Sequence, residues 1–290
     1  MSTEMPGWSV ETLHPWYRQA LRVDEMLYDS ETEHQRIRIF RNARFGRVMT
    51  LDDVVQVTEG DEFVYHEMLS HVPILAHGAA REVLVIGGGD GGMAREVLRH
   101  ASVERCTMVE IDRGVVDLCT LHMPSISDGV FDNPRLDLVI ADGAAFVAQT
   151  DRRFDIVIVD STDPIGPGEV LFTDSFYGRA KRCLAPGGII VTQNGVPFLQ
   201  GDELAGTLRA FRTLFADASC YMATIPTYAG GPMAFGWGSD GLARDTDEGV
   251  LAQRFAASAL TTKYYTPQVH KAAFALPAYI HRLLNAPGGH

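Results

Sequence analysis

Three aspartates follow apolar or glycine-rich stretches, in positions where acidic side chains could bind a cation. Asp160 and Asp163 come after the apolar run 156–159, and Asp90 lies within the glycine-rich stretch 87–92. In a parallel α/β sheet, the loops that leave the carboxyl ends of the strands meet at one edge, where ligands bind. We therefore expect the three carboxylates to converge on one pocket. Because carboxylates without a counter-charge repel one another, such a pocket favours a positively charged substrate.

A divalent metal is the alternative occupant of this pocket, but the chain carries no clear ligand motif for one. Neither histidines nor regularly spaced carboxylates surround the three aspartates. The pair His66 and His71 imitates a zinc-protease motif, yet the second histidine follows five positions after the first rather than four. On a helix this spacing turns the two rings about 140° apart, so they are badly placed to share a metal. We expect no metal site.

The glycine-rich stretch has the pattern of a nucleotide-binding turn. The apolar run 83–86 reads as a buried parallel strand, and residues 93–98 have the composition of a helix. Gly87 and Gly89 between them let the backbone turn sharply and approach a ligand, which would lie at the helix N-terminus. Alone, this pattern is equally compatible with an ordinary strand-to-helix turn.

Two later acidic residues favour the nucleotide interpretation. Glu110 ends the next predicted strand, about twenty residues after the turn, where an acidic side chain can accept hydrogen bonds from ribose hydroxyls. Asp142 and Gly143 follow the third strand, where a carboxylate can accept from the exocyclic amine of adenine and a glycine allows close approach. Together these strand ends predict an adenosine site. They do not distinguish a dinucleotide from an adenosyl-sulfonium donor.

The elements that must position these residues alternate between strand and helix. This alternation predicts an α/β fold with a doubly wound, Rossmann-like sheet of the class I methyltransferase type. A hairpin formed by 221–225 and 233–237 is expected at the sheet edge, and short helices broken by Pro267 and Pro277 over 266–284. The remaining predicted strands are 106–111, 136–140, 156–159 and 188–192, and the remaining predicted helices are 61–76, 114–121 and 173–183.

The first sixty residues have a different pattern. Between Leu21 and Thr58, short alternating runs are separated by turn residues, which is typical of an antiparallel meander. We expect two domains: a small antiparallel β domain at 1–60 and a Rossmann-like catalytic domain at 61–290. A β domain this thin must pack against its neighbour or a second subunit.

Composition limits the classes of function. The chain has 290 residues, 46% of them hydrophobic, and a formal net charge of −12. This charge argues against nucleic acid as a partner and is compatible with a cationic ligand. The four cysteines are widely spaced, so no disulfide framework is expected. Because no apolar run reaches the about 18 residues of a membrane span and no signal-peptide pattern is present, we expect a cytoplasmic protein that does not enter membranes.

Taken together, the motifs resemble those of a known family. The chain closely resembles the spermidine synthases, the polyamine aminopropyltransferases, and its bacterial members most of all, over nearly its whole length. The motifs that stand in family order are Tyr65-His66-Glu67-Met68, Gly87-Gly88-Gly89-Asp90-Gly91-Gly92, Val109-Glu110-Ile111-Asp112, Asp160-Ser161-Thr162-Asp163-Pro164 and Gln193-Asn194-Gly195.

This resemblance implies transfer of an aminopropyl group from decarboxylated S-adenosylmethionine to putrescine, giving spermidine and 5'-methylthioadenosine. It implies a co-substrate rather than a cofactor, and a homodimer or, alternatively, a homotetramer. By analogy, Asp90 binds the terminal amine of the donor, and Pro167 lies beside the donor in a gating loop. The residues that hold the nucleoside part are Gln35, Glu110, Asp142 and Gly143, together with the glycine turn at Gly87 and Gly89.

The resemblance also assigns an acceptor channel and a base. Asp160 becomes the proton acceptor, and the channel is lined by Tyr65, His66, Asp163, Gln193 and Tyr228. A solution pKa of about 3.9 makes an aspartate a poor base unless burial and neighbouring carboxylates raise the value. Ala141 departs from many relatives, which carry an acidic residue there, but Asp142 itself is kept.

The sequence alone leaves three other functions as alternatives. A methyltransferase that uses intact S-adenosylmethionine would have the same sheet and Glu110, although Asp90 would face and repel the donor's carboxylate. A nicotinamide oxidoreductase fits less well, because the glycine turn departs from the dinucleotide form. A silent sensor of adenosyl ligands is disfavoured by the intact Asp160 and Asp163. The choice among putrescine, cadaverine and longer polyamines depends on channel length and is not predicted.

Overall fold

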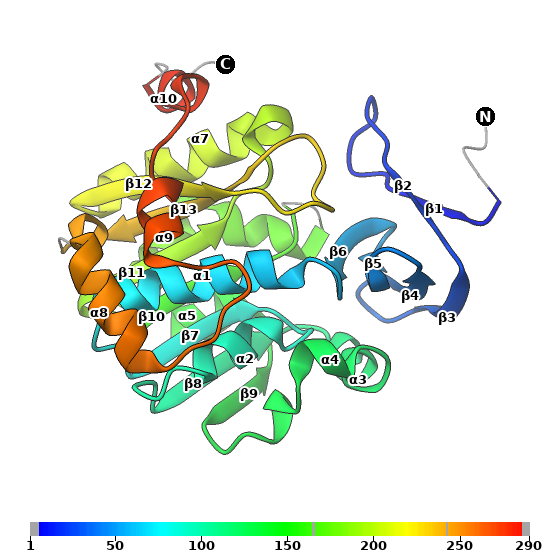
Figure 1. The fold of residues 1–290 in the computed structure, drawn as a ribbon, viewed down its shortest axis with the longest axis horizontal. Helices are drawn as coiled ribbons and strands as arrows, with labels where there is room; N and C mark the ends of the chain where they lie inside the picture. The colour runs from blue at the N-terminus through cyan, green and yellow to red at the C-terminus, as the bar shows by residue number, and fades with distance from the viewer. Residues whose placement is uncertain (1–5, 164–165, 242, 286–290) are drawn as a thin grey trace.

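The larger part of the molecule is built on one mixed sheet of seven strands. The computed structural model describes residues 6–163, 166–241 and 243–285. The strands of this sheet are β7 (Glu82–Gly87), β8 (Arg105–Glu110), β9 (Leu136–Ile140), β10 (Phe154–Asp160), β11 (Leu184–Gln193), β12 (Asp217–Ala223) and β13 (Met233–Ser239). They lie in the order β12-β13-β11-β10-β7-β8-β9 (Figure 1). The five strands from β11 to β9 pair in parallel, and β13 pairs antiparallel with both of its neighbours.

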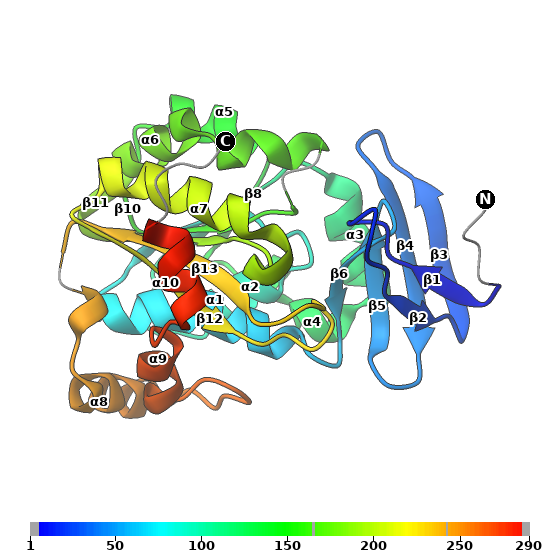
Figure 2. The ribbon, with the colours of Figure 1, turned by 90° about the horizontal axis from the view of Figure 1, so that it is seen from above.

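Helices cover both faces of this sheet. The helices are α1 (Glu62–His77), α2 (Gly92–Leu98), α3 (Arg113–His122), α4 (Pro124–Ser127), α5 (Gly143–Gln149), α6 (Asp174–Arg182), α7 (Pro197–Leu214), α8 (Glu248–Ser258), α9 (Pro267–Ala273) and α10 (Ala278–Asn285). Short 3-10 helices are η1 (Val130–Asp132), η2 (Gly166–Phe172) and η3 (Ala243–Asp245). One face packs against α1, α2, α8 and α9, and the other against α5, α6, α7 and α10 (Figure 2).

The central strand β7 shows why the sheet forms. Val83 and Val85 belong to the core on one face, and Leu84 and Ile86 to the core on the other. All four side chains are almost completely buried. Successive side chains of a strand point to opposite faces, so a continuous apolar run is what a strand with helices on both sides requires. The end of this strand therefore brings the glycine turn to the middle of the carboxyl edge.

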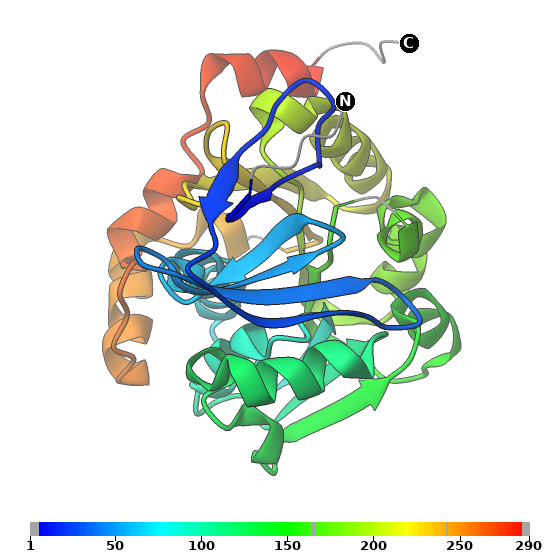
Figure 3. The same ribbon diagram turned by 90° about the vertical axis from the view of Figure 1, so that its right-hand side faces the viewer.

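A second, four-stranded antiparallel sheet stands against this edge (Figure 3). Its strands are β3 (Glu25–Glu31), β4 (Arg36–Asn42), β5 (Gly46–Leu51) and β6 (Val54–Thr58), paired in chain order. Ile37, Ile39 and Met49 of this sheet share a buried cluster with Val115 and Cys119 of α3. The thin β sheet is thus stabilised by packing against the larger part.

The structure confirms the predicted doubly wound sheet, the N-terminal meander and the edge hairpin, whose strands β12 and β13 pair antiparallel. Three features were not predicted. The first is a hairpin of β1 (Trp8–Val10) with β2 (Ala20–Arg22). The others are the helices α7 and α8. Within α7, the backbone departs from helical geometry at Gln200. The boundary between residues 60 and 61 stays a prediction, as does the gating position of Pro167, whose side chain lies outside the described residues.

Among the helices of the described ranges, none is long and apolar enough to span a membrane.

Glu67 of α1 binds the segment 263–265, near the C-terminal end of the chain. Its buried carboxylate accepts hydrogen bonds from the backbone N–H groups of Lys263, Tyr264 and Tyr265, at 2.7, 2.8 and 2.7 Å. We expect Glu67→Gln to lower the free energy of unfolding by about 2 kcal/mol, because charge-assisted bonds are lost and the new amide group faces backbone donors. Urea unfolding followed by circular dichroism measures this. Glu248→Gln, at an exposed helix position, is the control, and equal unfolding midpoints for the two variants would contradict the assignment.

Candidate functional site

The carboxyl edge of the large sheet and the inner side of the small sheet enclose a cavity of about 260 Å³. The walls come from β5 and β6, from the residues just before β4, from the start of α1 and from the ends of β7, β8, β10 and β11. Thirteen of the fourteen predicted site residues line it, and the side chain of the fourteenth, Pro167, lies outside the described residues. The thirteen are Gln35, Tyr65, His66, Gly87, Gly89, Asp90, Glu110, Asp142, Gly143, Asp160, Asp163, Gln193 and Tyr228. The structure therefore brings the residues from the separate motifs together.

Asp160 lies at the end of β10, in the middle of the cavity wall. Its Oδ1 accepts a hydrogen bond of 2.6 Å from the Tyr65 hydroxyl. Burial raises the pKa of Asp160 to about 6, with Asp90 adding to the rise and with His66 and Tyr65 opposing it. A carboxyl with this pKa is ionised at neutral pH and can still take up a proton. The pKa of Asp160 is thus raised above its solution value, as a proton acceptor in this position requires.

His66 carries a positive charge into this acidic site. Its Nδ1 lies 2.7 Å from Glu62 Oε2, and its Nε2 lies 3.6 Å from Asp90 Oδ1. Burial alone would lower the pKa of His66, but Asp90 and Glu62 raise it to about 10. The ring is therefore an imidazolium at neutral pH, and it offsets part of the negative charge of its neighbours.

A second acidic group lies farther along the cavity, around Asp163. Gln200 of α7 donates to Asp163 Oδ1 at 2.5 Å and to Glu203 Oε1 at 3.1 Å. Burial raises the pKa of Asp163, and burial together with Asp163 raises the pKa of Glu203 to about 7. Gln200 and Glu203 were not predicted as site residues, because no helix was predicted at 197–214. It also missed Glu11 of the N-terminal segment, which lines the cavity and accepts from Val55 N at 3.1 Å.

The opposite part of the cavity has the residues predicted for adenosine. Burial raises the pKa of Glu110 to about 7. A Cβ at Gly89 would lie 2.8 Å from Glu110 Oε2, so only glycine lets the turn come this close. Asp142 Oδ1 caps α5 by accepting from the backbone N–H groups of Ala144 and Ala145. Asp142 thus has a structural role in the free protein besides the predicted contact with adenine.

The remaining predicted residues are held by defined contacts. Gln35 Nε2 donates to Asp112 Oδ2 at 3.1 Å. Gln193 Nε2 donates to the Thr162 carbonyl at 3.1 Å, and the Tyr228 hydroxyl donates to the Gln56 carbonyl. No group of three or more His, Cys, Asp or Glu side chains within 6–163, 166–241 and 243–285 is arranged to hold a metal ion.

Comparison with known proteins gives consistent results over most of the chain. The model of the spermine/spermidine synthase domain matches residues 62–247, and the model of the spermidine synthase tetramerisation domain matches residues 7–59. The polyamine aminopropyltransferase of Ruegeria sp. (strain TM1040) is 67% identical over 95% of this chain and 98% of its own length. Polyamine aminopropyltransferase 1 of Pseudomonas aeruginosa is 59% identical over 93% of this chain and 95% of its own.

Solved structures give the same result. A spermidine synthase in complex with the transition state analogue AdoDATO superimposes with a TM-score of 0.91 and 35% identity, covering 96% of this chain and 94% of that one. Spermidine synthase from Thermotoga maritima has a TM-score of 0.88 and 34% identity, with coverage of 96% and 93%.

The raised carboxyl pKa values predict how stability changes with pH. The pKa is about 6 for Asp160 and about 7 for Glu110 and Glu203, against about 4 in an unfolded chain. Between pH 8 and pH 5 each of these three groups therefore binds more protons in the folded protein than in the unfolded chain, and contributes stability that rises as pH falls through this window. His100 and His270, whose pKa values burial lowers to about 3, oppose this gain below about pH 6.5.

We expect Asp160→Asn to raise the melting temperature at pH 8 by about 2–4 °C and to reduce its increase towards pH 6, because the buried charge is gone. Differential scanning calorimetry of the ligand-free protein measures both effects. Asp202→Asn, at an exposed position, controls for the loss of a carboxylate. A lower melting temperature for Asp160→Asn at pH 8 would show that the buried charge of Asp160 does not destabilise the folded protein.

Proposed function

This chain belongs to the spermine/spermidine synthase family, and from that premise we propose that it is a spermidine synthase. It transfers the aminopropyl group of decarboxylated S-adenosylmethionine to putrescine, and the products are spermidine and 5'-methylthioadenosine. The observation that carries this proposal is the convergence of Asp90, Asp160 and Asp163 on one cavity. Both substrates are cations, and the three carboxylates supply the opposite charge.

The donor occupies the part of the cavity near β7 and β8. Glu110 accepts from the ribose hydroxyls, and Asp142 with Gly143 lies against the adenine. The further donor-binding residues are Gln35, Gly87, Gly89 and Pro167. Asp90 accepts from the terminal amine of the aminopropyl chain. Intact S-adenosylmethionine would place a carboxylate near Asp90, and the repulsion between the two charges selects the decarboxylated form.

The acceptor approaches from the side of Asp163, along Tyr65, His66, Gln193 and Tyr228. Its attacking nitrogen, as the neutral amine, uses its lone pair to form a bond to the methylene carbon next to the sulfonium, while the other nitrogen stays charged. The carbon–sulfur bond breaks with its electron pair passing to sulfur. The attacking nitrogen then carries one proton too many, which Asp160 accepts. Tyr65 holds the Asp160 carboxylate in place. Much of the rate comes from holding two flexible cations in line.

The match of residues 7–59 to a tetramerisation domain supports an oligomer. We propose a homodimer, with a homotetramer as the alternative, and size-exclusion chromatography with light scattering separates the two. The cytoplasmic location expected from the sequence stays a prediction.

A product assay tests the proposed reaction. Purified protein is incubated with putrescine and decarboxylated S-adenosylmethionine, and in parallel with putrescine and the intact donor, and products are measured by mass spectrometry. We expect spermidine and 5'-methylthioadenosine with the decarboxylated donor only. S-adenosylhomocysteine from the intact donor would instead establish a methyltransferase, and the absence of both products would overturn the proposal.

The role of Asp160 predicts a separation of turnover from binding. We expect Asp160→Asn to lower kcat by about 100-fold or more, because general-base catalysis contributes about 10²–10⁴-fold to such reactions. The dissociation constant of the donor should change far less, since Asp90 and Glu110 remain. Steady-state kinetics and calorimetric titration measure the two quantities. Turnover near the wild-type value would remove Asp160 from the role of proton acceptor.

A further inference from the structure

The contacts of His66 continue into the protein as a chain of alternating charges. Glu62 lies one turn before His66 on α1, and its Oε2 atom is 2.7 Å from His66 Nδ1, within hydrogen-bond distance. The same oxygen accepts a hydrogen bond of 2.8 Å from an Nη atom of Arg95 on α2. Glu62 is 7% exposed and lies behind the ring, so its charge is shared between the imidazolium and the guanidinium. Asp90, His66, Glu62 and Arg95 therefore follow one another with opposite signs.

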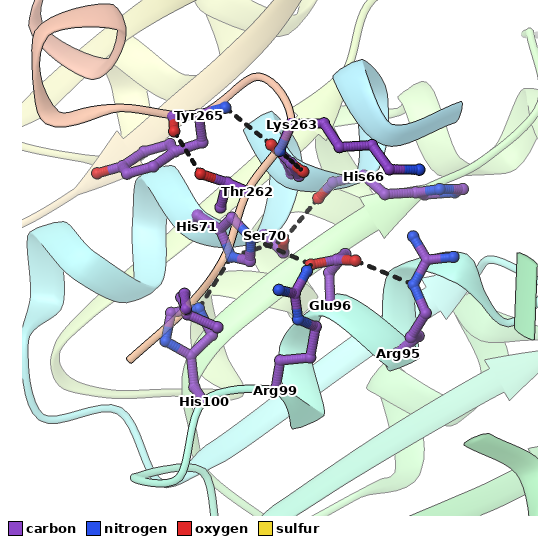
Figure 4. Close-up of polar contacts among 12 residues, drawn as sticks. His66, Ser70, His71, Arg95, Glu96, Arg99, His100, Thr262, Lys263 and Tyr265 are labelled. Carbon is purple, nitrogen blue, oxygen red and sulfur yellow. Dashed lines mark hydrogen bonds and ion pairs between the residues drawn. The ribbon is translucent and has the colours of Figure 1, made fainter. Parts of the chain in front are cut away.

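Arg95 is itself fixed at a second carboxylate. Its Nε atom donates to Glu96 Oε1 at 2.9 Å. Glu96 also accepts from Arg99 at 2.7 Å, and His71 Nε2 lies 3.1 Å from Glu96 Oε2. Figure 4 shows Glu96 between Arg95 and His71. Arg95 also donates to the Ile126 carbonyl, so its guanidinium is held beside Glu62 by contacts with three separate groups.

The orientation of the His66 ring is fixed by packing as well as by charge. A Cβ at Gly92 would lie 2.3 Å from Cε1 of the ring, so only glycine leaves the ring its space. The Ser70 hydroxyl donates to the His66 carbonyl at 2.6 Å, which holds the helix backbone at this point. The ring therefore presents Nε2 to Asp90, while Nδ1 faces Glu62.

We propose that Glu62 is a positioning residue for the transfer reaction: held by Arg95, it keeps the His66 ring protonated at both nitrogens and aimed at Asp90. The proposal rests on the proposed function, because its effect on turnover passes through Asp160. Glu62 lies 2.7 Å from Nδ1 and Asp90 lies 3.6 Å from Nε2, so the buried ring stands between two carboxylates, and both favour its charged form. The titratable and charged groups near the ring include Glu62 and Tyr65 of α1, Asp90 of the glycine turn and Asp160 of β10. Arg95 of α2 acts on the ring through Glu62.

A fixed cation at this place favours the ionised form of Asp160. The positive charge of His66 opposes the rise that burial gives to the pKa of Asp160. Asp160 must be ionised to accept a proton, so a neutral His66 would confine activity to higher pH. Glu62 thereby affects the reaction without touching either substrate's reacting atoms.

The variant that tests this is Glu62→Gln. The glutamine fills the same space and can accept from Nδ1–H, but it lacks the charge that stabilises the imidazolium. We expect the acidic limb of the kcat/KM profile to move to higher pH by about one unit. From a pKa of about 6, a shift of about one unit lowers kcat/KM about twofold at pH 7 and close to tenfold at about pH 5, and the loss disappears as the pH is raised.

The matched control is Glu82→Gln. Glu82 is also paired with an arginine, Arg152, at 3.3 Å, but it lies at the start of β7, away from the cavity. We expect its pH profile to equal that of the wild type. A Glu62→Gln profile that is lower at every pH but unshifted would show a structural role only and would overturn the proposal.

A second measurement needs neither activity nor a folded variant at position 62. Long-range ¹H–¹⁵N spectra of histidine-labelled wild-type protein at pH 8 report the protonation of each ring, and the missing signal in His66→Gln assigns His66. We expect an imidazolium at this pH. A neutral ring would overturn the role of Glu62, whereas a wild-type protein that makes no spermidine would overturn the proposed function, and the catalytic role of Glu62 with it.

Discussion

Repulsion among carboxylates in a confined cavity is the constraint on which this structure depends. Asp90, Asp160 and Asp163 line the same space, and Glu110 lies at its other end. Burial raises the pKa values of Asp160 and Glu110, which means that the folded protein holds these charges at a cost. The imidazolium of His66 offsets part of the cost in the free protein, and cationic substrates offset the rest when they bind. On the proposed function, affinity for the cationic substrates follows from this unbalanced charge.

The glycine turn after β7 makes this arrangement sterically possible. A Cβ at Gly87 would lie 2.0 Å from the Asp160 carbonyl oxygen, and a Cβ at Gly88 would lie 2.9 Å from an Asp160 carboxylate oxygen. In the same way, a Cβ at Gly89 would lie 2.8 Å from Glu110 Oε2, and a Cβ at Gly92 would lie 2.3 Å from His66 Cε1. Several glycines of one turn therefore leave space for the side chains that we propose to bind and react. The usual reason for such a turn, access of the backbone to a ligand, is only part of its role here.

How much could be predicted from the sequence depended on whether a signal was local. The sheet followed from continuous apolar runs such as 83–86, and the cavity followed from the rule that strand ends meet at one edge. Gln200 was missed because its partner Asp163 lies more than thirty positions away in the chain. The spacing of Glu62 and His66, four positions apart, is a local signal that was overlooked, whereas the contact of Glu62 with Arg95 is distant in the chain. The raised pKa of Asp160 could be anticipated only as a requirement, since its magnitude depends on burial and on the distances to His66 and Tyr65. Assignment of the reaction needed the family, because the fold alone serves many donors.

The most direct test of this account is a calorimetric titration of the ligand-free protein with decarboxylated S-adenosylmethionine and, separately, with the intact compound. The two ligands share the nucleoside and the sulfonium and differ by the carboxylate that would face Asp90. Unbalanced negative charge in the cavity predicts binding of the decarboxylated form at least about tenfold tighter, which corresponds to about 1.4 kcal/mol. Equal affinities, or tighter binding of the intact compound, would contradict the claim that the charge of the cavity selects the substrate.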